Sequence, residues 1–275
     1  MPIQEHARII DFRKVTENYC QITLSTKYIS ANALPGQFVT VRVNSETTPL
    51  LRRPFSIYNC SPQREIIDIL FDVVGEGTKL LADKEVNDQL DILGPLGKGF
   101  EIPQTAPGQT AKNLDKAPPH KIAILVGGGI GIAPLLYLAK TLKGKIPAVY
   151  AIIGARSKNH LIDPAEFTNT GAQVLTCTDD GSAGKRGLAP EFIPPILEEA
   201  KEMARETVIY ACGPRPMLKM CAEIAQQYNV PCQISMEEKM ACGVGACMGC
   251  VVKTRAGYKK VCDDGPVFKA EEIVW

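Results

Sequence analysis

The first hundred residues alternate apolar and polar positions in short runs, which is the pattern of half-buried β-strands. Turn residues such as Leu34-Pro35-Gly36 separate the runs, and one short helix is expected near 77–82. The predicted strands are 8–15, 19–25, 37–43, 53–58, 65–74 and 89–93. Several short strands at this spacing predict a closed antiparallel β-barrel.

From residue 121 the pattern changes to apolar strands that alternate with amphipathic helices. The strands are expected at 122–126, 148–153, 172–176 and 207–211, and the helices at 132–143, 190–204 and 214–228. This alternation predicts a doubly wound α/β domain with a parallel sheet. The fold class is therefore α/β plus β.

The same patterns divide the chain into four segments. A β-barrel domain is expected at 1–103 and an α/β domain at 121–234, with a cysteine-rich segment at 235–275. The polar stretch 104–120, with three prolines and little apolar content, is expected to be a linker or an interdomain loop.

Composition excludes several classes of protein. The 275 residues carry a net charge of +1 without a long Lys/Arg run, so a nucleic-acid surface is not expected. The uncharged stretch 122–139 approaches transmembrane length, but four glycines and Pro134 interrupt it, and a buried strand, loop and helix is the better interpretation. No membrane association and no secretory signal are expected, which indicates a cytoplasmic location. In a reducing compartment the ten cysteines point to a metal site and to packing rather than to disulfides.

The cysteine spacing near the C-terminus carries the strongest chemical signal. Cys242, Cys247 and Cys250 form C-x4-C-x2-C, and Cys262 follows after a predicted hairpin over 251–262. Four thiolates at this spacing are typical of a [2Fe–2S] cluster. Structural zinc is the alternative, although it usually pairs two C-x2–4-C knuckles. The intervening Gly243, Gly245 and Gly249 are expected to allow positive φ and to point N–H groups at the sulfurs.

A second motif, Arg53-Pro54-Phe55-Ser56, lies on a predicted barrel strand. An arginine can bind a pyrophosphate through two hydrogen bonds, and the serine can bond a flavin nitrogen. The aromatic ring between them can lie on the flavin or its ribityl chain. Taken alone, an R-x-x-S pattern occurs often by chance, and an arginine on a surface strand is its usual explanation.

A third motif runs from Leu70-Phe71-Asp72 into Gly75-Glu76-Gly77-Thr78 at a helix start. Backbone N–H groups at such a position can bind an anion. The alternative is an ordinary strand–helix turn in which Thr78 caps the helix.

A glycine-rich loop follows the strand at 122–126. Gly127, Gly128, Gly129 and Gly131 let a dinucleotide diphosphate approach the backbone before the helix that contains Pro134. The loop is G-x-G-x-x-P rather than G-x-G-x-x-G, and no acidic residue ends the second strand, which reads Ala155-Arg156. A nucleotide site is therefore expected, with NAD and NADP both open.

Together with Cys212-Gly213-Pro214, these motifs resemble the ferredoxin–NADP reductase superfamily over nearly the whole chain. The resemblance implies two cofactor sites and places Ser56 and Cys212 beside the reacting rings. It implies FAD contacts from Arg53, Pro54, Phe55, Ser56, Leu70, Phe71, Asp72, Gly77 and Thr78. It implies NAD contacts from Gly127, Gly128, Gly129, Gly131, Cys212, Gly213, Pro214 and Met217. Phe55 stands where the superfamily has tyrosine, which removes one hydroxyl.

The cluster motif narrows the resemblance to the electron-transfer subunits of NAD-dependent dihydroorotate dehydrogenases of pyrimidine biosynthesis. Such subunits carry FAD and one [2Fe–2S] cluster, which here implies Cys242, Cys247, Cys250 and Cys262 as ligands. They pair with an FMN-containing catalytic subunit, which implies a heterotetramer with two copies of each.

A flavin can link single-electron transfer by a cluster to hydride transfer by a nicotinamide. The resemblance therefore implies an electron route from the partner's flavin through the cluster and FAD to NAD⁺. No residue of this chain is a candidate base for dihydroorotate oxidation, so that step is assigned to the partner.

Two alternative functions stay open. One is the small subunit of an electron-bifurcating ferredoxin–NADP oxidoreductase, whose first cluster ligand is an aspartate where this chain has Cys242. The other is a redox sensor without turnover.

Overall fold

A computed structural model describes residues 1–102, 121–203 and 205–275. The proposed linker 104–120 lies outside the described residues. Contacts between residues divide the chain into two compact units. The first unit comprises 1–99, 236–267 and 272–275, and the second comprises 100–235 and 268–271. Most of the cysteine-rich segment thus groups with the barrel. The division into functional domains at 103, 120 and 234 remains a proposal.

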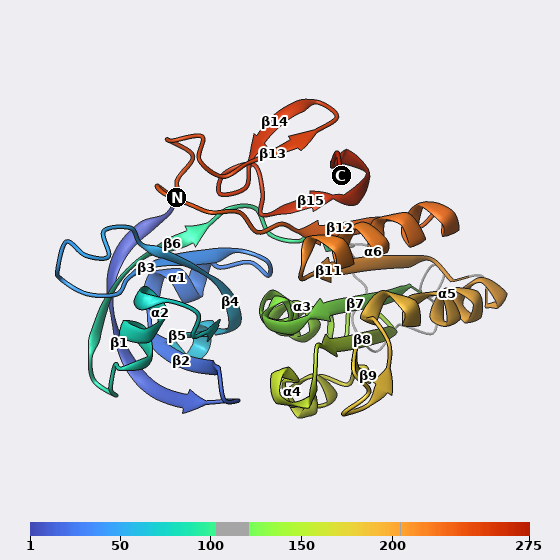
Figure 1. Cartoon of the computed structure of the whole chain (residues 1–275), viewed down its shortest axis with the longest axis horizontal. Helices are drawn as coiled ribbons and strands as arrows, with labels where there is room; N and C mark the ends of the chain where they lie inside the picture. The colour runs from blue at the N-terminus through green and yellow to red at the C-terminus, as the bar shows by residue number, and fades with distance from the viewer. Residues whose placement is uncertain (103–120, 204) are drawn as a thin grey trace. The chain divides into compact units, whose positions relative to one another are not determined.

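The predicted barrel is confirmed in the first unit (Figure 1). It closes in the order β1-β2-β5-β4-β3-β6, and all its strand pairs are antiparallel. The strands are β1 Ile3–Lys14, β2 Tyr19–Ser25, β3 Phe38–Arg42, β4 Arg53–Ser61, β5 Ile66–Asp72 and β6 Gln89–Leu96. Alternation along each strand fills the interior with apolar side chains such as Val39, Ile57 and Ile69, which are fully buried.

Two helices accompany the barrel. The expected one is α2 Glu76–Ala82, and the other, α1 Lys27–Asn32, was not predicted from the sequence. Thr26 caps α1 by accepting a hydrogen bond from the Ser30 N–H at 3.2 Å. The buried Ile29 attaches this helix to the barrel. Six residues are too few to show helical periodicity, which explains the missed prediction.

The second unit confirms the doubly wound α/β prediction. Its sheet has the order β10-β9-β8-β7-β11-β12-β15 (Figure 1). Its strands are β7 Ile122–Gly128, β8 Ala148–Ala155, β9 Gln173–Thr178, β10 Lys185–Arg186, β11 Thr207–Cys212, β12 Cys232–Ser235 and β15 Val267–Lys269. Its helices are α3 Ala133–Leu142, α4 Ala165–Thr168, α5 Ile193–Glu202 and α6 Arg215–Tyr228. Helix α3 contacts α4 and α5 contacts α6, as expected for helix pairs on opposite faces of a sheet with right-handed crossovers.

The second unit starts at Phe100, whereas the sequence placed the start of the α/β domain at residue 121. The Glu101 backbone N–H donates to Gln233 Oε1 at 2.8 Å, and its carbonyl accepts from Gln233 Nε2 at 2.8 Å and from the Tyr210 hydroxyl at 3.1 Å. Phe100 packs edge-on against Tyr210, with 5.5 Å between ring centroids. These bonds attach residues 100–101 to the α/β sheet.

Candidate redox and nucleotide sites

The four candidate ligand cysteines lie in the first unit, on a loop and on the hairpin β13 Val251–Thr254 and β14 Gly257–Lys260 that follows it. The predicted hairpin is thereby confirmed. Cys250 and Cys262 are buried, Cys242 is half-buried and Cys247 is exposed. Within the described residues, no three His, Cys, Asp or Glu side chains converge as a closed metal site. The cysteines instead interact in pairs, Cys242 with Cys247 and Cys250 with Cys262.

Backbone N–H groups of this segment already point at the sulfurs. Gly245 N–H donates to Cys262 Sγ at 3.1 Å, Cys262 N–H to Cys250 Sγ at 3.4 Å, and Val244 N–H to Cys242 Sγ at 3.5 Å. Cluster thiolates accept hydrogen bonds of this kind. The donor set and its backbone hydrogen bonds therefore fit an iron–sulfur cluster.

Left-handed backbone conformations shape the loop around the cysteines. Gly243 and Gly245 have φ of 70° and 81°, as expected. The third left-handed position is Met248, with φ of 53°, rather than Gly249, so that expectation was wrong. The sequence could not show this, because a left-handed methionine is uncommon and leaves no signal.

The environment of the thiols differs along the loop. Burial raises the pKa of Cys242, but hydrogen bonds from Val244 N–H and the Cys247 side chain outweigh it and lower that pKa to about 7. At Cys262, burial and hydrogen bonding to Cys250 raise the pKa to about 12. Iron binding must displace any thiol proton. Deprotonation is therefore easier at Cys242 than at Cys262.

Lys260 fastens the loop to the hairpin. Its Nζ donates to the Gly245 carbonyl at 3.0 Å and forms an ion pair with Asp263 at 2.7 Å. The hydrogen bond to Asp263 raises the pKa of Lys260. The cysteine spacing, from which the site was predicted, did not indicate a role for Lys260 or Asp263.

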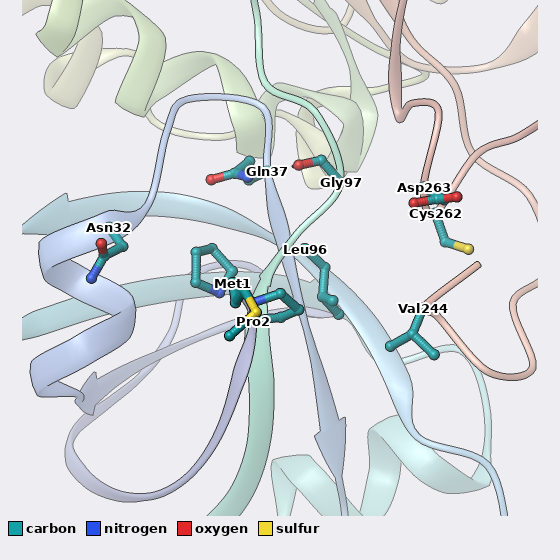
Figure 2. Close-up of a pocket in the computed structure, with 10 residues that line it drawn as sticks. Met1, Pro2, Asn32, Gln37, Leu96, Gly97, Val244, Cys262 and Asp263 are labelled. Carbon is teal, nitrogen blue, oxygen red and sulfur yellow. Dashed lines mark hydrogen bonds between the residues drawn. The ribbon is translucent and has the colours of Figure 1, made fainter. Parts of the chain in front are cut away.

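A cavity of about 350 Å³ lies beside Cys262 in the first unit (Figure 2). Val244 and Asp263 of the cluster segment line it together with Met1, Gln37 and Leu96 of the barrel. Val244 and Met248 are 45% and 55% exposed, which is high for apolar side chains. The cysteine-rich segment 235–275 thus presents exposed apolar side chains next to the buried candidate ligand Cys262.

The Arg53 motif lies at the start of β4, next to α2. A Cβ built on Gly77 would lie 2.5 Å from Arg53 Nε and 3.0 Å from Cζ, so the guanidinium occupies the space that this glycine leaves. One guanidinium nitrogen also donates to the Leu51 carbonyl. The structure thus brings together the arginine and the glycine that the sequence placed in two separate motifs.

The other residues of these two motifs take different positions. Phe55 points into the barrel, where its ring centroid lies 5.5 Å from that of Phe71, and only 8% of it is exposed. Its ring therefore offers little surface on which a flavin could stack. Strand alternation places Ser56 on the opposite, outer face, where it is half-buried. Leu70 and Phe71 are buried, and Asp72 is half-buried.

Thr78 acts as the helix-capping residue. Its hydroxyl accepts from the N–H groups of Val74 and Gly75 at 2.9 and 3.1 Å and donates to the Gly75 carbonyl at 3.1 Å. These hydrogen bonds explain a threonine at this position even without a bound anion. They support the alternative interpretation, in which Thr78 caps an ordinary strand–helix turn.

Replacing Gly77 with alanine is expected to weaken flavin binding without unfolding the protein. The new methyl group would displace the Arg53 guanidinium, which is the mobile end of a long side chain and can move at small cost. Gly75→Ala is the matched control, because its Cβ would meet no atom within 4 Å. FAD titration and thermal melting would test both variants. Equal FAD affinity in the two variants would contradict a binding role for the guanidinium.

The nucleotide motifs converge at the carboxyl ends of β7 and β11. These strands are parallel neighbours, with Gly127 in register with Cys212. From β7 the chain winds outward through β8 on one side, and β11 lies on the other. A dinucleotide binds at such a reversal in doubly wound sheets. The fold therefore places both predicted motifs at the expected position.

Close backbone packing explains the glycines of this site. A Cβ on Gly131 would lie 2.5 Å from both the Cys212 carbonyl oxygen and Gly213 Cα. A Cβ on Gly128 would lie 2.6 Å from Met217 Sδ and 3.1 Å from Pro214 Cδ. The half-buried Cys212 thus ends its strand directly against the glycine loop. The loop opens a short 3-10 turn, Gly129–Ile132, ahead of α3.

Gly131→Ala is expected to raise KM for NADH and to destabilise the second unit. The added methyl group would meet backbone atoms that cannot move independently, and overpacking of this kind costs about 1–3 kcal/mol. Steady-state dye reduction by NADH and thermal melting would measure the two effects. FAD content should stay unchanged. An unchanged KM for NADH would contradict a role of this loop in nucleotide binding.

Comparison with known proteins identifies the family. A model of the iron–sulfur cluster binding domain of dihydroorotate dehydrogenase B matches residues 237–274, and a model of the oxidoreductase NAD-binding domain matches 125–223. The electron transfer subunit of NAD(+)-dependent dihydroorotate dehydrogenase B from Caldanaerobacter subterraneus subsp. tengcongensis is 39% identical over 273 residues, covering 98% of each chain. The corresponding subunit from Geobacillus kaustophilus is 39% identical over 274 residues, with the same coverage. The chain belongs to this family of electron transfer subunits.

Structural similarity agrees with the family. A solved NADH-dependent reduced ferredoxin–NADP oxidoreductase, studied for flavin-based electron bifurcation, has a TM-score of 0.80 and 30% identity, covering 98% of this chain and 90% of its own. A ferredoxin reductase of carbazole 1,9a-dioxygenase shares the fold, with a TM-score of 0.63 and 20% identity over 84% of this chain and 67% of its own. The higher identity to dihydroorotate dehydrogenase subunits favours that family over the bifurcating one.

As an electron transfer subunit of dihydroorotate dehydrogenase B, this oxidoreductase chain operates with a catalytic subunit. Its cluster-binding segment and NAD-binding domain match family models, which confirms the predicted family and general function. None of the helices in the described part of the chain combines the length and the hydrophobicity that crossing a bilayer requires.

Proposed function

We propose that the chain carries electrons between NAD⁺ and an FMN-containing catalytic subunit that oxidises dihydroorotate, in a cytoplasmic heterotetramer with two copies of each subunit. FAD, one [2Fe–2S] cluster and NAD are its cofactors. The observation that supports the proposal best is the grouping of the four cysteines with the Arg53–Gly77 pair in one compact unit. One unit of the chain would then hold both the cluster and the flavin.

The residues of the chain divide the binding work. Arg53 would bind the pyrophosphate of FAD, and Ser56, on the same strand β4, would hydrogen-bond the flavin ring. Gly128 and Gly131 would admit the NAD diphosphate, and Cys212, in register with Gly127, would contact the nicotinamide. The cysteines 242, 247, 250 and 262 hold the cluster. When bound, FAD supplies the conversion between single-electron and hydride transfer.

The catalytic subunit is proposed to dock on the cluster segment. Val244 and Met248 are exposed there, and Val244 also lines the cavity beside Cys262 (Figure 2). An apolar surface of this kind suits an interface whose core excludes water. Docking at this face would place the partner closest to the group that passes single electrons.

Reconstitution would test the proposed function. The purified chain should reduce an artificial two-electron dye with NADH but should not oxidise dihydroorotate. A mixture with the FMN-containing subunit should oxidise dihydroorotate with NAD⁺. If the chain reduces the dye but no ratio of the two subunits oxidises dihydroorotate with NAD⁺, the proposed partnership is wrong. Absence of both activities in the cofactor-loaded chain would favour a sensor.

A further inference from the structure

One buried hydroxyl on the barrel, that of Thr40, is paired with no described residue. Thr40 on β3 is 2% exposed, and its Oγ1 is buried without a hydrogen-bond partner among the described residues. Leaving a buried hydroxyl unpaired costs stability, typically about 1–3 kcal/mol. A valine has nearly the same shape without this cost, so the fold alone gives no reason for threonine at this position.

The strand register explains why the barrel offers no partner. Thr40 is opposite Pro54 on β4 and Leu93 on β6. Both neighbours have apolar side chains, and the proline also lacks a backbone N–H. Thr40 points outward, because Val39 and Val41 on either side of it fill the barrel interior.

The cluster loop covers this outer position. A Cβ on Gly243 would lie 2.9 Å from Thr40 Cγ2, and Gly243 directly follows the candidate ligand Cys242. The methyl group of Thr40 thus supports the loop, while its hydroxyl lies within one side-chain rotation of the same region. Sulfur atoms of a bound cluster would be the acceptors that the apolar neighbours do not supply.

We propose that the Thr40 hydroxyl donates a hydrogen bond to the Cys242 thiolate or to a bridging sulfide of the bound cluster and thereby raises its reduction potential. Thr40 is then a positioning and tuning residue rather than a ligand. A hydrogen bond to sulfur stabilises the reduced, more negative cluster more than the oxidised one. This inference rests on the proposed cluster at Cys242, Cys247, Cys250 and Cys262.

Two variants separate the hydroxyl from the methyl group. Thr40→Val removes the hydroxyl and keeps the shape, whereas Thr40→Ser keeps the hydroxyl and removes the methyl group that contacts Gly243. Each full-length holoprotein would be titrated with reductant while the cluster's EPR signal is recorded. Thr40→Val should make cluster reduction about tenfold less favourable, a shift of about 59 mV toward negative potential for one electron. Thr40→Ser should keep the wild-type potential.

Other outcomes overturn the inference. An unchanged potential in Thr40→Val, with normal FAD and iron content, would show that the hydroxyl does not bond the cluster. Equal shifts in both variants would assign the effect to packing against Gly243. A shift in the FAD potential alone would place the hydroxyl bond on the flavin. A wild-type protein without any cluster EPR signal would instead overturn the proposed function itself.

Discussion

Cys247→Ser is expected to abolish the cluster's visible absorbance and its EPR signal while FAD stays bound. Cys247 is exposed, so the substitution removes a thiol without opening a cavity in the core. A serine hydroxyl stays protonated at neutral pH and is a poor iron ligand, since metal binding requires the deprotonated side chain. A [2Fe–2S] cluster takes four protein ligands, and a protonated hydroxyl at position 247 would leave one of the four positions unfilled. Iron analysis and absorbance spectra of the purified variant would measure the loss.

The control for this variant is Cys60→Ser. Cys60 lies on β4 of the same unit and its thiol donates to the Ser30 carbonyl at 3.2 Å, a bond that a serine hydroxyl can replace. This variant should keep full iron content. NADH-dependent dye reduction should survive in both variants, because neither residue belongs to the proposed nucleotide sites. Stoichiometric zinc in place of iron in the wild-type protein would refute the cluster assignment.

Periodicity was sufficient to predict the two architectures. Alternation over the first hundred residues predicted a barrel, and the apolar runs such as 122–126 predicted a parallel sheet, both of which the structure confirms. It could not predict the strand order, because β3 lies between β4 and β6 through contacts between distant segments. The start of the second unit at Phe100 was not predicted for the same reason, whereas α1 was not predicted because its six residues are too few to show helical periodicity.

Motifs predicted which residues gather, but not how each one is used. Gly77 and Arg53 are 24 positions apart, and only the structure shows that the Arg53 guanidinium fits because residue 77 has no side chain. The motif allowed Phe55 to lie on a flavin or its ribityl chain, and only the structure shows that strand alternation turns its ring toward Phe71 in the barrel core. Thr40 belongs to no motif, since its significance depends on the register that places it opposite Pro54 and under Gly243. Functional roles that arise from register have no local sequence signal.

Arg53→Ala is expected to weaken FAD binding roughly 30- to 150-fold. The guanidinium is the cation that lies over Gly77, and a charge-assisted contact of this kind is worth about 2–3 kcal/mol. The variant should lose FAD on dilution or gel filtration, and fluorescence titration of the flavin-free protein would give the dissociation constant. Arg53→Lys should recover part of the affinity, because a lysine supplies the charge without the two-pronged geometry.

Arg52→Ala is the matched control, because the side chain of this neighbouring arginine already bonds to Asp91 of the barrel. Its guanidinium forms an ion pair with Asp91 at 2.6 Å and donates to the Asp91 carbonyl at 2.9 Å. Its removal should lower the melting temperature and leave Asp91, already buried on one oxygen, without its cation. FAD affinity should change little. If instead Arg52→Ala lost FAD and Arg53→Ala retained it, Arg52 would be the residue that contacts the pyrophosphate. The Arg53 guanidinium would then serve only to hold the Leu51 carbonyl at the edge of the barrel.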